Sequence, residues 1–313
     1  MQGELAAERT SAGSCCDWFR IGGITVEMAG TRPSDIDFPH PLSLFRSEAT
    51  ETDIEIQVQY VKQFTTQQGR KLFDSGSTWR LYEDEAGFQF DFLAVSPGEQ
   101  PYRRLIVDRF FENAVLQMNE FSMARAPFSV STLAYPLDEL LIMHRLTQEQ
   151  AIELHGAGIV TRDGIANLFV GHSGAGKSTT TRLWTAREEV EVLSDDRIIV
   201  RKERRQARGQ VANSGLRMYG TPWHGEAMFA SPNSAWLKRI LILEHGQENR
   251  LTPLTRSHAV AELFARSFVP FHRHEHVESA LSFLEEVVES VPVYRFAFEP
   301  DQRAVDAVLS LRD

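Results

Sequence analysis

Residues 167–179 read NLFVGHSGAGKST, and this stretch decides the fold of the second half of the chain. Within it, Gly171 to Ser178 match the pattern G-x-x-x-x-G-K-[ST] at each fixed position. Glycine at 171, 174 and 176 lets successive amide N–H groups turn toward phosphate oxygens. An apolar strand over 167–170 and a helix over 177–185 are expected on either side. The stretch therefore predicts a strand–loop–helix that binds phosphate groups.

The predicted ligand of this loop is ATP with Mg²⁺. Lys177 supplies a mobile charge for the β- and γ-phosphates, and the Ser178 hydroxyl can hold the ion. No N-K-x-D segment of the guanine-specific kind is present, which favours ATP. The alternative is a glycine turn that merely links a strand to a helix. The residues expected to contact the nucleotide are Gly171, His172, Ser173, Gly174, Ala175, Gly176, Lys177, Ser178 and Thr179.

Two adjacent carboxylates follow the predicted helix. Residues 190–196 read as a strand that ends in Asp195 and Asp196. In P-loop folds an acidic residue at the end of a neighbouring strand reaches the magnesium ion directly or through water. One aspartate can thus hold the ion while the other accepts a proton. The alternative is a solvated turn before a strand at 198–200.

Three motifs in order resemble a known family. His155-Gly156, the phosphate loop and LSDDR at 193–197 together resemble the catalytic domain of HPr kinase/phosphorylase, including its smaller peptide-tailoring serine kinase relatives. That fold is shared with ATP-dependent phosphoenolpyruvate carboxykinases, and the resemblance covers about residues 137–300. It implies an α/β domain of this P-loop type and raises the expectation of a homo-oligomer.

The resemblance also implies roles for single residues. Lys177 and the loop amides would hold the phosphates, and Ser178 with Asp196 would hold magnesium. Asp195 would be the general base that deprotonates the acceptor hydroxyl. His155 would lie near the γ-phosphate and the acceptor; the alternative for this residue is a histidine packed between strands.

One segment departs from the family pattern. Residues 217–226 do not align with the arginine–glycine segment of HPr kinases, so neither HPr as acceptor nor the reverse phosphorylase reaction is implied. Within Tyr219–Glu226, Thr221, His224 and Glu226 could meet the acceptor or the metal, and Trp223 could stack on a base. A structural turn built on residues 220–222 is the equal alternative.

The first half of the chain predicts a second domain. Residues 17–136 are expected to form a mostly antiparallel, β-rich α+β domain with an accessory or substrate-binding role. Strands are expected at 21–28, 53–59, 78–82, 88–95 and 104–107, and helical spacing appears at 110–123. Residues 1–16 read as a disordered tail, in which Cys15 and Cys16 are incidental reduced thiols.

The second domain, 137–313, makes the protein α/β in its nucleotide-binding part and α+β overall. Helices are expected at 137–145, 177–185, 257–267 and 276–289, with a final helix that Asp301 caps and that runs to Leu311. Strands are expected at 152–154, 158–161, 167–170, 190–193, 198–200, 239–244 and 293–298.

Charge and hydropathy narrow the class of partner. The 313 residues carry a formal net charge of −10, which argues against nucleic acid as a partner. No apolar run is long enough to cross a bilayer, and the N-terminus lacks a secretory signal, so we expect a cytoplasmic protein. The basic cluster at 201–208 reads as a solvated hairpin connection, with contact to an acidic partner as the alternative.

Two further sets of side chains have open interpretations. Arg266 could reach a phosphate, although an exposed helix arginine is the favoured interpretation. His272, His274 and His276 alternate like zinc ligands, but without cysteine or a fourth ligand a polar loop before a helix is favoured.

The sequence thus predicts an ATP-dependent kinase that transfers the γ-phosphoryl group to a hydroxyl of a protein, peptide or small molecule. The alternative is a nucleotide-dependent binding or regulatory protein with little catalysis.

Overall fold

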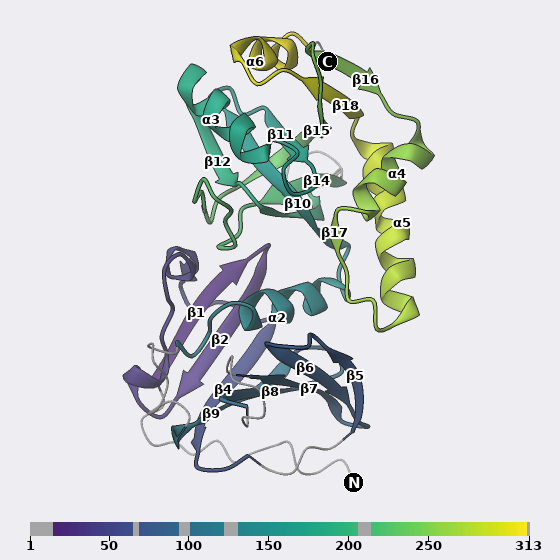
Figure 1. Ribbon diagram of the computed structural model, residues 1–313. Coiled ribbons are helices and arrows are strands. Elements are labelled where there is room, and N and C mark those ends of the chain that lie inside the picture. The colour runs from purple at the N-terminus through teal and green to yellow at the C-terminus, as the bar shows by residue number, and fades with distance from the viewer. Residues whose placement is uncertain (1–14, 65–68, 94–100, 122–130, 206–213, 312–313) are drawn as a thin grey trace. The chain divides into compact units, whose positions relative to one another are not determined.

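The computed structural model describes residues 15–64, 69–93, 101–121, 131–205 and 214–311. Contacts divide the chain into two compact units (Figure 1). The larger parts of the first are Thr25–Pro39 and Ser47–Ala134, and the second combines Arg20–Ile24 and His40–Arg46 with Tyr135–Asp313. The predicted limits, 17–136 and 137–313, describe domains that fold independently. They remain predictions. The protein as a whole is mixed α/β and rich in strands.

The first sheet has nine strands in the order β3-β1-β2-β4-β9-β8-β7-β6-β5. Apolar side chains alternate along it, as in β4, where Ile54, Ile56 and Val58 are buried and their neighbours are exposed. Its strands are β1 (Cys15–Ile21), β2 (Ile24–Gly30), β3 (Arg46–Ser47), β4 (Ile54–Val61), β5 (Arg70–Asp74), β6 (Trp79–Glu83), β7 (Gly87–Phe92), β8 (Arg103–Asp108) and β9 (Asn113–Asn119). Short 3-10 turns lie at Pro33–Asp35 and Leu42–Phe45.

The first sheet contains both antiparallel and parallel strand pairs. β5 to β9 form an antiparallel meander, as expected for a mostly antiparallel domain. β4, however, runs parallel to both β2 and β9, so the sheet is mixed. Parallel pairing joins segments that are distant in sequence, and strand periodicity carries no information about direction.

The helical spacing predicted at 110–123 is wrong for residues 113–119, whereas residues 120–121 are helical and 122–123 lie outside the described residues. Residues 113–119 form strand β9, which lies between β4 and β8. Its buried residues Ala114, Leu116 and Met118 follow the two-residue period of a strand. The same apolar residues also fit a helical pattern, and pairing on both sides decides between the two.

The cysteines correct the prediction of a tail that extends to residue 16. Cys15 and Cys16 begin β1 and are half-buried free thiols. Burial raises the pKa of the Cys16 thiol, and contact with Glu27 adds to that effect. Residues 1–14 lie outside the described part of the chain.

The second unit is built on a closed five-stranded barrel. The ring runs β10-β13-β14-β15 and closes through a parallel pairing of β15 with β11, which also pairs with β10. Its strands are β10 (Ala151–Thr161), β11 (Ala166–Val170), β13 (Arg197–Arg204), β14 (Ser214–Tyr219) and β15 (Ser234–His245). Around the ring lie β12 (Val190–Ser194), β16 (Arg250–Pro253), β17 (Ser267–Phe268) and β18 (Val293–Phe298).

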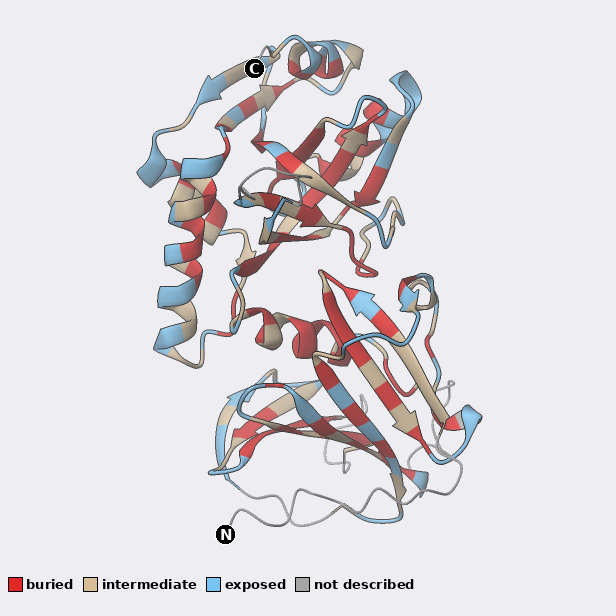
Figure 2. Ribbon diagram, turned by 180° about the vertical axis from the view of Figure 1, so that it is seen from behind, coloured by how far each residue is buried: buried red, intermediate tan, exposed pale blue. Residues whose placement is uncertain are grey.

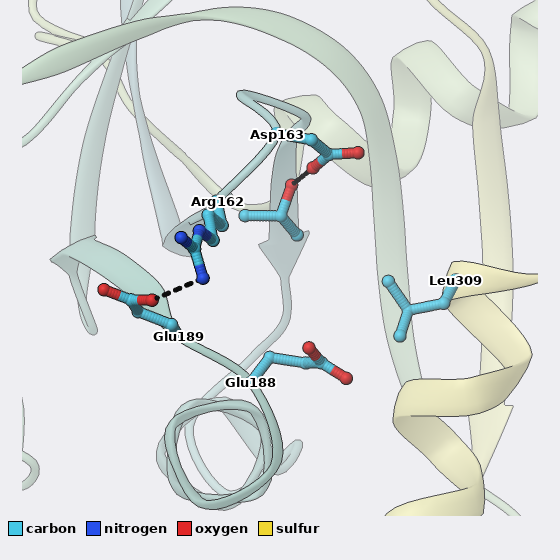
Figure 3. A pocket seen from close by; sticks show the side chains of 6 residues that line it. Arg162, Asp163, Glu188, Glu189 and Leu309 are labelled. Atoms are coloured by element: carbon cyan, nitrogen blue, oxygen red, sulfur yellow. Dashed lines mark hydrogen bonds and ion pairs between the residues drawn. The ribbon is translucent and has the colours of Figure 1, made fainter.

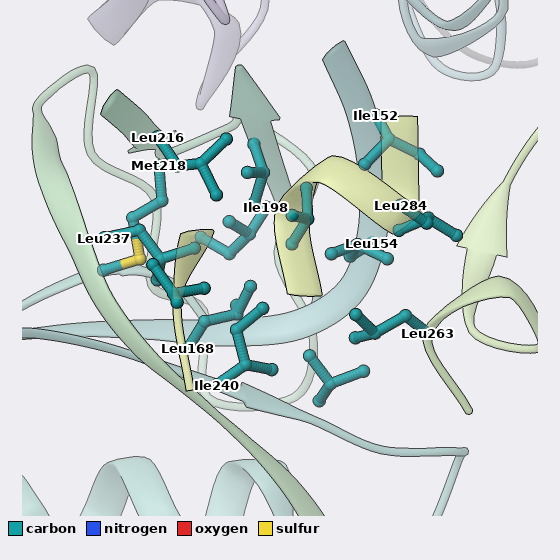
Figure 4. Packing of buried hydrophobic residues seen from close by; sticks show 14 of the residues in the cluster. Ile152, Leu154, Leu168, Ile198, Leu216, Met218, Leu237, Ile240, Leu263 and Leu284 are labelled. Carbon is teal, nitrogen blue, oxygen red and sulfur yellow. The ribbon is translucent and has the colours of Figure 1, made fainter. Parts of the chain in front are cut away.

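Apolar side chains from all five strands fill the barrel (Figure 4). Leu263 of helix α4 and Leu284 of helix α5 join the same cluster, so these two helices cover the barrel. In Figure 2, α5 is buried on one side and exposed on the other, as its apolar spacing predicts. The helices described are α2 (Leu137–Leu146), α3 (Lys177–Arg187), α4 (Arg256–Phe264), α5 (His274–Ser290) and α6 (Gln302–Leu309).

A second cluster anchors α3 and α6. Trp184 of α3 is 1% exposed, and its ring centroid lies 5.9 Å from that of Phe169 in β11. Phe298 of β18 and Val305 of α6 belong to the same cluster. The helix that starts at the glycine-rich loop is therefore fixed on the strand that precedes it.

Most predicted elements of this unit are confirmed. The helix at 137–145 and the strand at 293–298 match within one residue at each end, and Asp301 caps α6 by accepting a hydrogen bond from Arg303 N at 2.9 Å. The strands predicted at 152–154 and 158–161 are one strand, β10, which bends at a bulge after Gly158 and pairs with different partners in its two halves. No helix in the described ranges is long and apolar enough to span a membrane.

Candidate functional site

The glycine-rich loop joins β11 to α3, as its sequence predicts (Figure 1). Gly174 and Gly176 have φ angles of 81° and 101°, which side chains with a Cβ rarely adopt. Ala175 N donates to His172 O at 3.1 Å, so the chain turns sharply within the loop. The backbone thus takes the wrapped path that the glycines permit.

The start of α3 offers free amide donors to this loop. Thr180 N donates to Gly176 O at 2.8 Å, the first bond of the helical ladder. The N–H groups of Lys177, Ser178 and Thr179 precede that bond and have no acceptor within the helix. Gly176, the N-cap, has no side chain to accept from them. These three amides and the positive end of the helix are suited to an anion.

Lys177 is buried at the base of the loop. Its side chain donates from Nζ to Gly171 O at 3.1 Å and to His172 O at 3.2 Å, and the residue is 7% exposed. Burial lowers the pKa of Lys177, and the negative charge of Asp196 opposes that effect. The ammonium group is therefore held by loop carbonyls and lies within range of the acidic pair.

Backbone hydrogen bonds join the three sequence motifs. Gly171 N donates to His155 O at 3.2 Å, and Gly156 N donates to Asp196 O at 3.0 Å. His155 N also donates to Arg266 O at 2.8 Å. The histidine–glycine pair, the phosphate loop and the second aspartate thus form one connected site.

The side chains of His155 and Asp196 meet in this site. His155 Nε2 lies 2.9 Å from Asp196 Oδ1, and Arg197 Nη1 donates to the other carboxylate oxygen. Burial alone would raise the pKa of Asp196, but the hydrogen bond from His155 and the charge of Arg197 outweigh it and lower the pKa. Asp196 is therefore an ionised carboxylate among cations. His155 is not simply packed between strands, since its ring contacts this carboxylate.

Asp195 has a different environment from its neighbour. It is 1% exposed, and its Oδ1 accepts from Gly225 N at 2.9 Å and Phe229 N at 3.2 Å. Its Oδ2 accepts from Ala227 N at 2.8 Å. Both carboxylate oxygens accept from backbone donors, so Asp195 holds the chain at 225–229 in place.

The segment Tyr219–Glu226 is mainly structural where the structure resolves its contacts. Thr221 Oγ1 donates to Arg197 O at 2.8 Å, and the Tyr219 hydroxyl donates to Glu203. Trp223 is 7% exposed and donates from Nε1 to Asp138 Oδ2 at 2.8 Å. Of the two interpretations left open for this segment, the structural one fits Trp223, because both its ring and its N–H are engaged inside the protein.

Sequence reasoning missed Arg197 and its partners. Arg197 Nε donates to Glu139 Oε1 at 2.8 Å, and its Cζ lies 3.9 Å from the ring centroid of Phe268. Glu153 Oε1 is 3.4 Å from the same Nε and its residue is fully buried. The one feature of the sequence that could have indicated a role for Arg197 was its position directly after the two aspartates.

Arg266 corrects the interpretation of an exposed helix arginine. It follows α4, its side chain is 9% exposed, and its Nη1 donates to Glu262 O at 2.8 Å. Its positive charge, followed by burial, lowers the pKa of His172 in the phosphate loop. Arg266 therefore contributes positive potential to the loop.

The three alternating histidines do not form a metal centre. The ring of His272 stacks on His144 with centroids 5.2 Å apart, whereas His274 is exposed and pairs with Glu278. His276 Nδ1 lies 3.2 Å from Pro270 O. Within the described ranges, no group of three or more His, Cys, Asp or Glu side chains could hold a metal ion.

A cavity of about 490 Å³ lies away from the phosphate loop (Figure 3). It opens beside the C-terminal end of α3, where Arg162 and Glu189 form an exposed ion pair at 3.3 Å. The loop lies at the opposite end of that helix, so the cavity is not part of the candidate site. Its lining residues are Thr161, Arg162, Asp163, Glu188, Glu189 and Leu309.

Substitution of Gly176 should destabilise the protein more than substitution of Gly174, because only Gly176 packs against another side chain. A Cβ at this position would lie 2.6 Å from the Phe298 ring, whereas a Cβ at Gly174 meets nothing within 4 Å. Both substitutions to alanine cost about 1–2 kcal/mol for the left-handed backbone. Gly176→Ala should cost about 1–3 kcal/mol more through overpacking. Denaturant unfolding of the two variants measures the difference; equal losses would contradict this packing.

Comparison of the chain with protein-family models and with curated proteins finds no match. A proposal about function therefore has to rest on the connected site formed by the loop, Lys177, His155 and Asp196.

Proposed function

We propose that the protein is a Mg²⁺-dependent kinase that transfers the γ-phosphoryl group of ATP to a hydroxyl group of a protein, peptide or small molecule. The observation that supports this most is the backbone bonding of His155 to Gly171 and of Gly156 to Asp196. It brings an anion-binding loop, a buried lysine and an ionised carboxylate into one site. Phosphoryl transfer depends mainly on such positioned charges.

Amide groups at the start of α3 and the Lys177 ammonium would hold the phosphates. Lys177 Nζ donates to the carbonyl oxygens of Gly171 and His172, and phosphate oxygens would replace these as acceptors. The lysine would then keep its hydrogen bonds and gain an opposite charge. Arg266 adds to the attraction because its charge acts on the same loop.

The oxygen atoms near the loop fit magnesium. Mg²⁺ prefers oxygen ligands and keeps several of its waters. The Ser178 hydroxyl stands half-buried in the first turn of α3, and the charge of Asp196 acts on neighbouring Lys177. Ser178 would bind the ion directly and Asp196 through a coordinated water. Bound there, the ion neutralises charge on the phosphates.

The acceptor hydroxyl must lose a proton. We propose that Asp196, rather than Asp195, takes up this proton. Asp195 is 1% exposed and accepts only from backbone N–H groups of 225–229, so an acceptor hydroxyl could reach it only if that chain moved. Asp196 is partly exposed, with a side chain 26% accessible, and His155 orients it at 2.9 Å. As the hydroxyl oxygen bonds to phosphorus, its proton passes to the Asp196 carboxylate and the bond to ADP breaks.

The three motifs support membership in the HPr kinase/phosphorylase-like group of P-loop kinases, which shares its fold with phosphoenolpyruvate carboxykinases. On this proposal residues 137–313 are the nucleotide-binding domain and residues 17–136 serve the acceptor. A cytoplasmic location and a homo-oligomer are part of the same proposal. The net charge of −10 supports a partner other than nucleic acid.

Transfer can be tested with γ-labelled ATP, Mg²⁺ and a cell extract as the source of acceptors. The expected result is a labelled acceptor whose labelling needs magnesium and is lost in Lys177→Ala. Binding of ATP without a labelled product would instead favour a nucleotide-dependent regulatory protein. Label lost as free phosphate alone would identify an ATPase and contradict the kinase proposal.

A further inference from the structure

Arg197 links the candidate site to the start of helix α2. One edge of its guanidinium group, at Nε, donates to Glu139 Oε1 at 2.8 Å. Its Nη1 donates to Asp196 Oδ2, and its flat face covers the Phe268 ring. A guanidinium group is planar and presents its donors in a rigid fork. Three contacts in three directions therefore fix its plane.

Glu139 is the carboxylate that holds this arginine from outside the site. It stands in the first turn of α2 and is 8% exposed. Glu153, at 3.4 Å from the same Nε, is fully buried, and burial followed by the charge of Glu139 raises its pKa well above the usual range. The shorter distance and the raised pKa of Glu153 both give Glu139 the larger share of the pairing with Arg197.

The same turn of α2 holds a second part of the site. Asp138 Oδ2 accepts from Trp223 Nε1 at 2.8 Å, and Trp223 precedes the chain that Asp195 fixes. Asp138 thus anchors Trp223, and Glu139 anchors Arg197, the residue after Asp196. Neither of them lies in a sequence motif.

We propose that Glu139 is a positioning residue that sets the orientation of the Asp196 carboxylate through Arg197. With Arg197 fixed, Asp196 Oδ2 is held by Nη1 and Oδ1 is turned to His155. In Glu139→Gln an amide oxygen can still accept from Nε, but the negative charge that strengthens this contact is lost, so the Nε edge of Arg197 is held more weakly. The consequence for catalysis, although not the geometry itself, rests on the proposed kinase function.

The test compares Glu139→Gln with Glu149→Gln. Glu149 is a matched control, because it follows the same helix and pairs with Arg201, further along β13, at 2.9 Å. The first measurement is the ring ¹⁵N and ¹H NMR signals of His155 in histidine-labelled protein, assigned with His155→Gln. Glu139→Gln should move these signals and Glu149→Gln should leave them unchanged. Unchanged His155 signals in folded Glu139→Gln would overturn the inference.

The second measurement is transfer. Glu139→Gln should lower kcat by about 10- to 100-fold, as loss of an outer support does, without weakening Mg·ATP binding. In an Asp196→Asn background it should have no further effect, because the two residues act as one unit. Full additivity of the two changes would contradict action through Asp196.

Misfolding of Glu139→Gln and failure of the kinase proposal can each be told apart from failure of the positioning role. If Glu139→Gln does not fold, Glu139→Asp keeps the charge and shortens the side chain, and it should move the His155 signals in the same way. If the unmodified chain neither binds Mg·ATP nor transfers phosphate, the kinase proposal fails, while the His155 signals still decide the positioning role.

Discussion

Lys177→Ala should weaken the binding of Mg·ATP by about 100-fold or more, close to 3 kcal/mol. The ammonium group is the buried cation of the loop, and a charged hydrogen bond of this kind contributes about 1.5–3 kcal/mol. Its loss also removes the partner of Gly171 O and His172 O. Isothermal titration calorimetry with Mg·ATP measures the change.

The matched control for this variant is Lys202→Ala. Lys202 is a half-buried lysine on β13 that pairs with Glu286, away from the loop. It should leave the nucleotide affinity unchanged. Equal affinities for Lys177→Ala and the unmodified chain would remove Lys177 from the nucleotide site.

Replacement by asparagine should affect catalysis at Asp196 and stability at Asp195. Asp196→Asn should lower transfer by about 1,000-fold, the scale of a lost general base, and this loss should far exceed the losses in Mg·ATP affinity and thermal stability that follow from removing its charge. Asp195→Asn should lower the free energy of unfolding by about 3 kcal/mol, because an amide replaces a buried carboxylate that accepts three N–H groups.

Denaturant unfolding and a transfer assay on both variants check this pair of results. A stable Asp195→Asn protein without transfer would restore the role that the family resemblance implies for Asp195. An active Asp196→Asn protein would exclude Asp196 as the proton acceptor.

The strand–loop–helix around residues 171–179 could be predicted from the sequence because its geometry is local. The phosphate loop, the strand before it and helix α3 depend on residues within one short segment, and glycine at 174 and 176 meets a backbone requirement that no neighbour changes. Apolar periodicity likewise predicted β4, β18 and α2 within two residues at each end.

What the sequence did not predict depends on contacts between distant segments. Residues 113–119, within the stretch of helical spacing, form strand β9 because β4 and β8 pair with this segment on both sides. The engagement of Asp195 by the chain at 225–229, and the link from Glu139 to Arg197, join residues that no spacing rule relates. The three motifs predicted which residue types meet, whereas the different hydrogen-bond partners of Asp195 and Asp196 required the fold.

We propose that the loop at 171–179 binds a magnesium nucleotide. The most direct test is a calorimetric titration of the full chain with Mg·ATP, with Gly176→Ala measured beside it. Saturable binding of one nucleotide per chain, weakened when an added methyl group meets the Phe298 ring, is the predicted result. A titration of the folded chain that gives no heat with Mg·ATP would contradict it. A normal thermal unfolding transition of the same sample shows that the chain is folded.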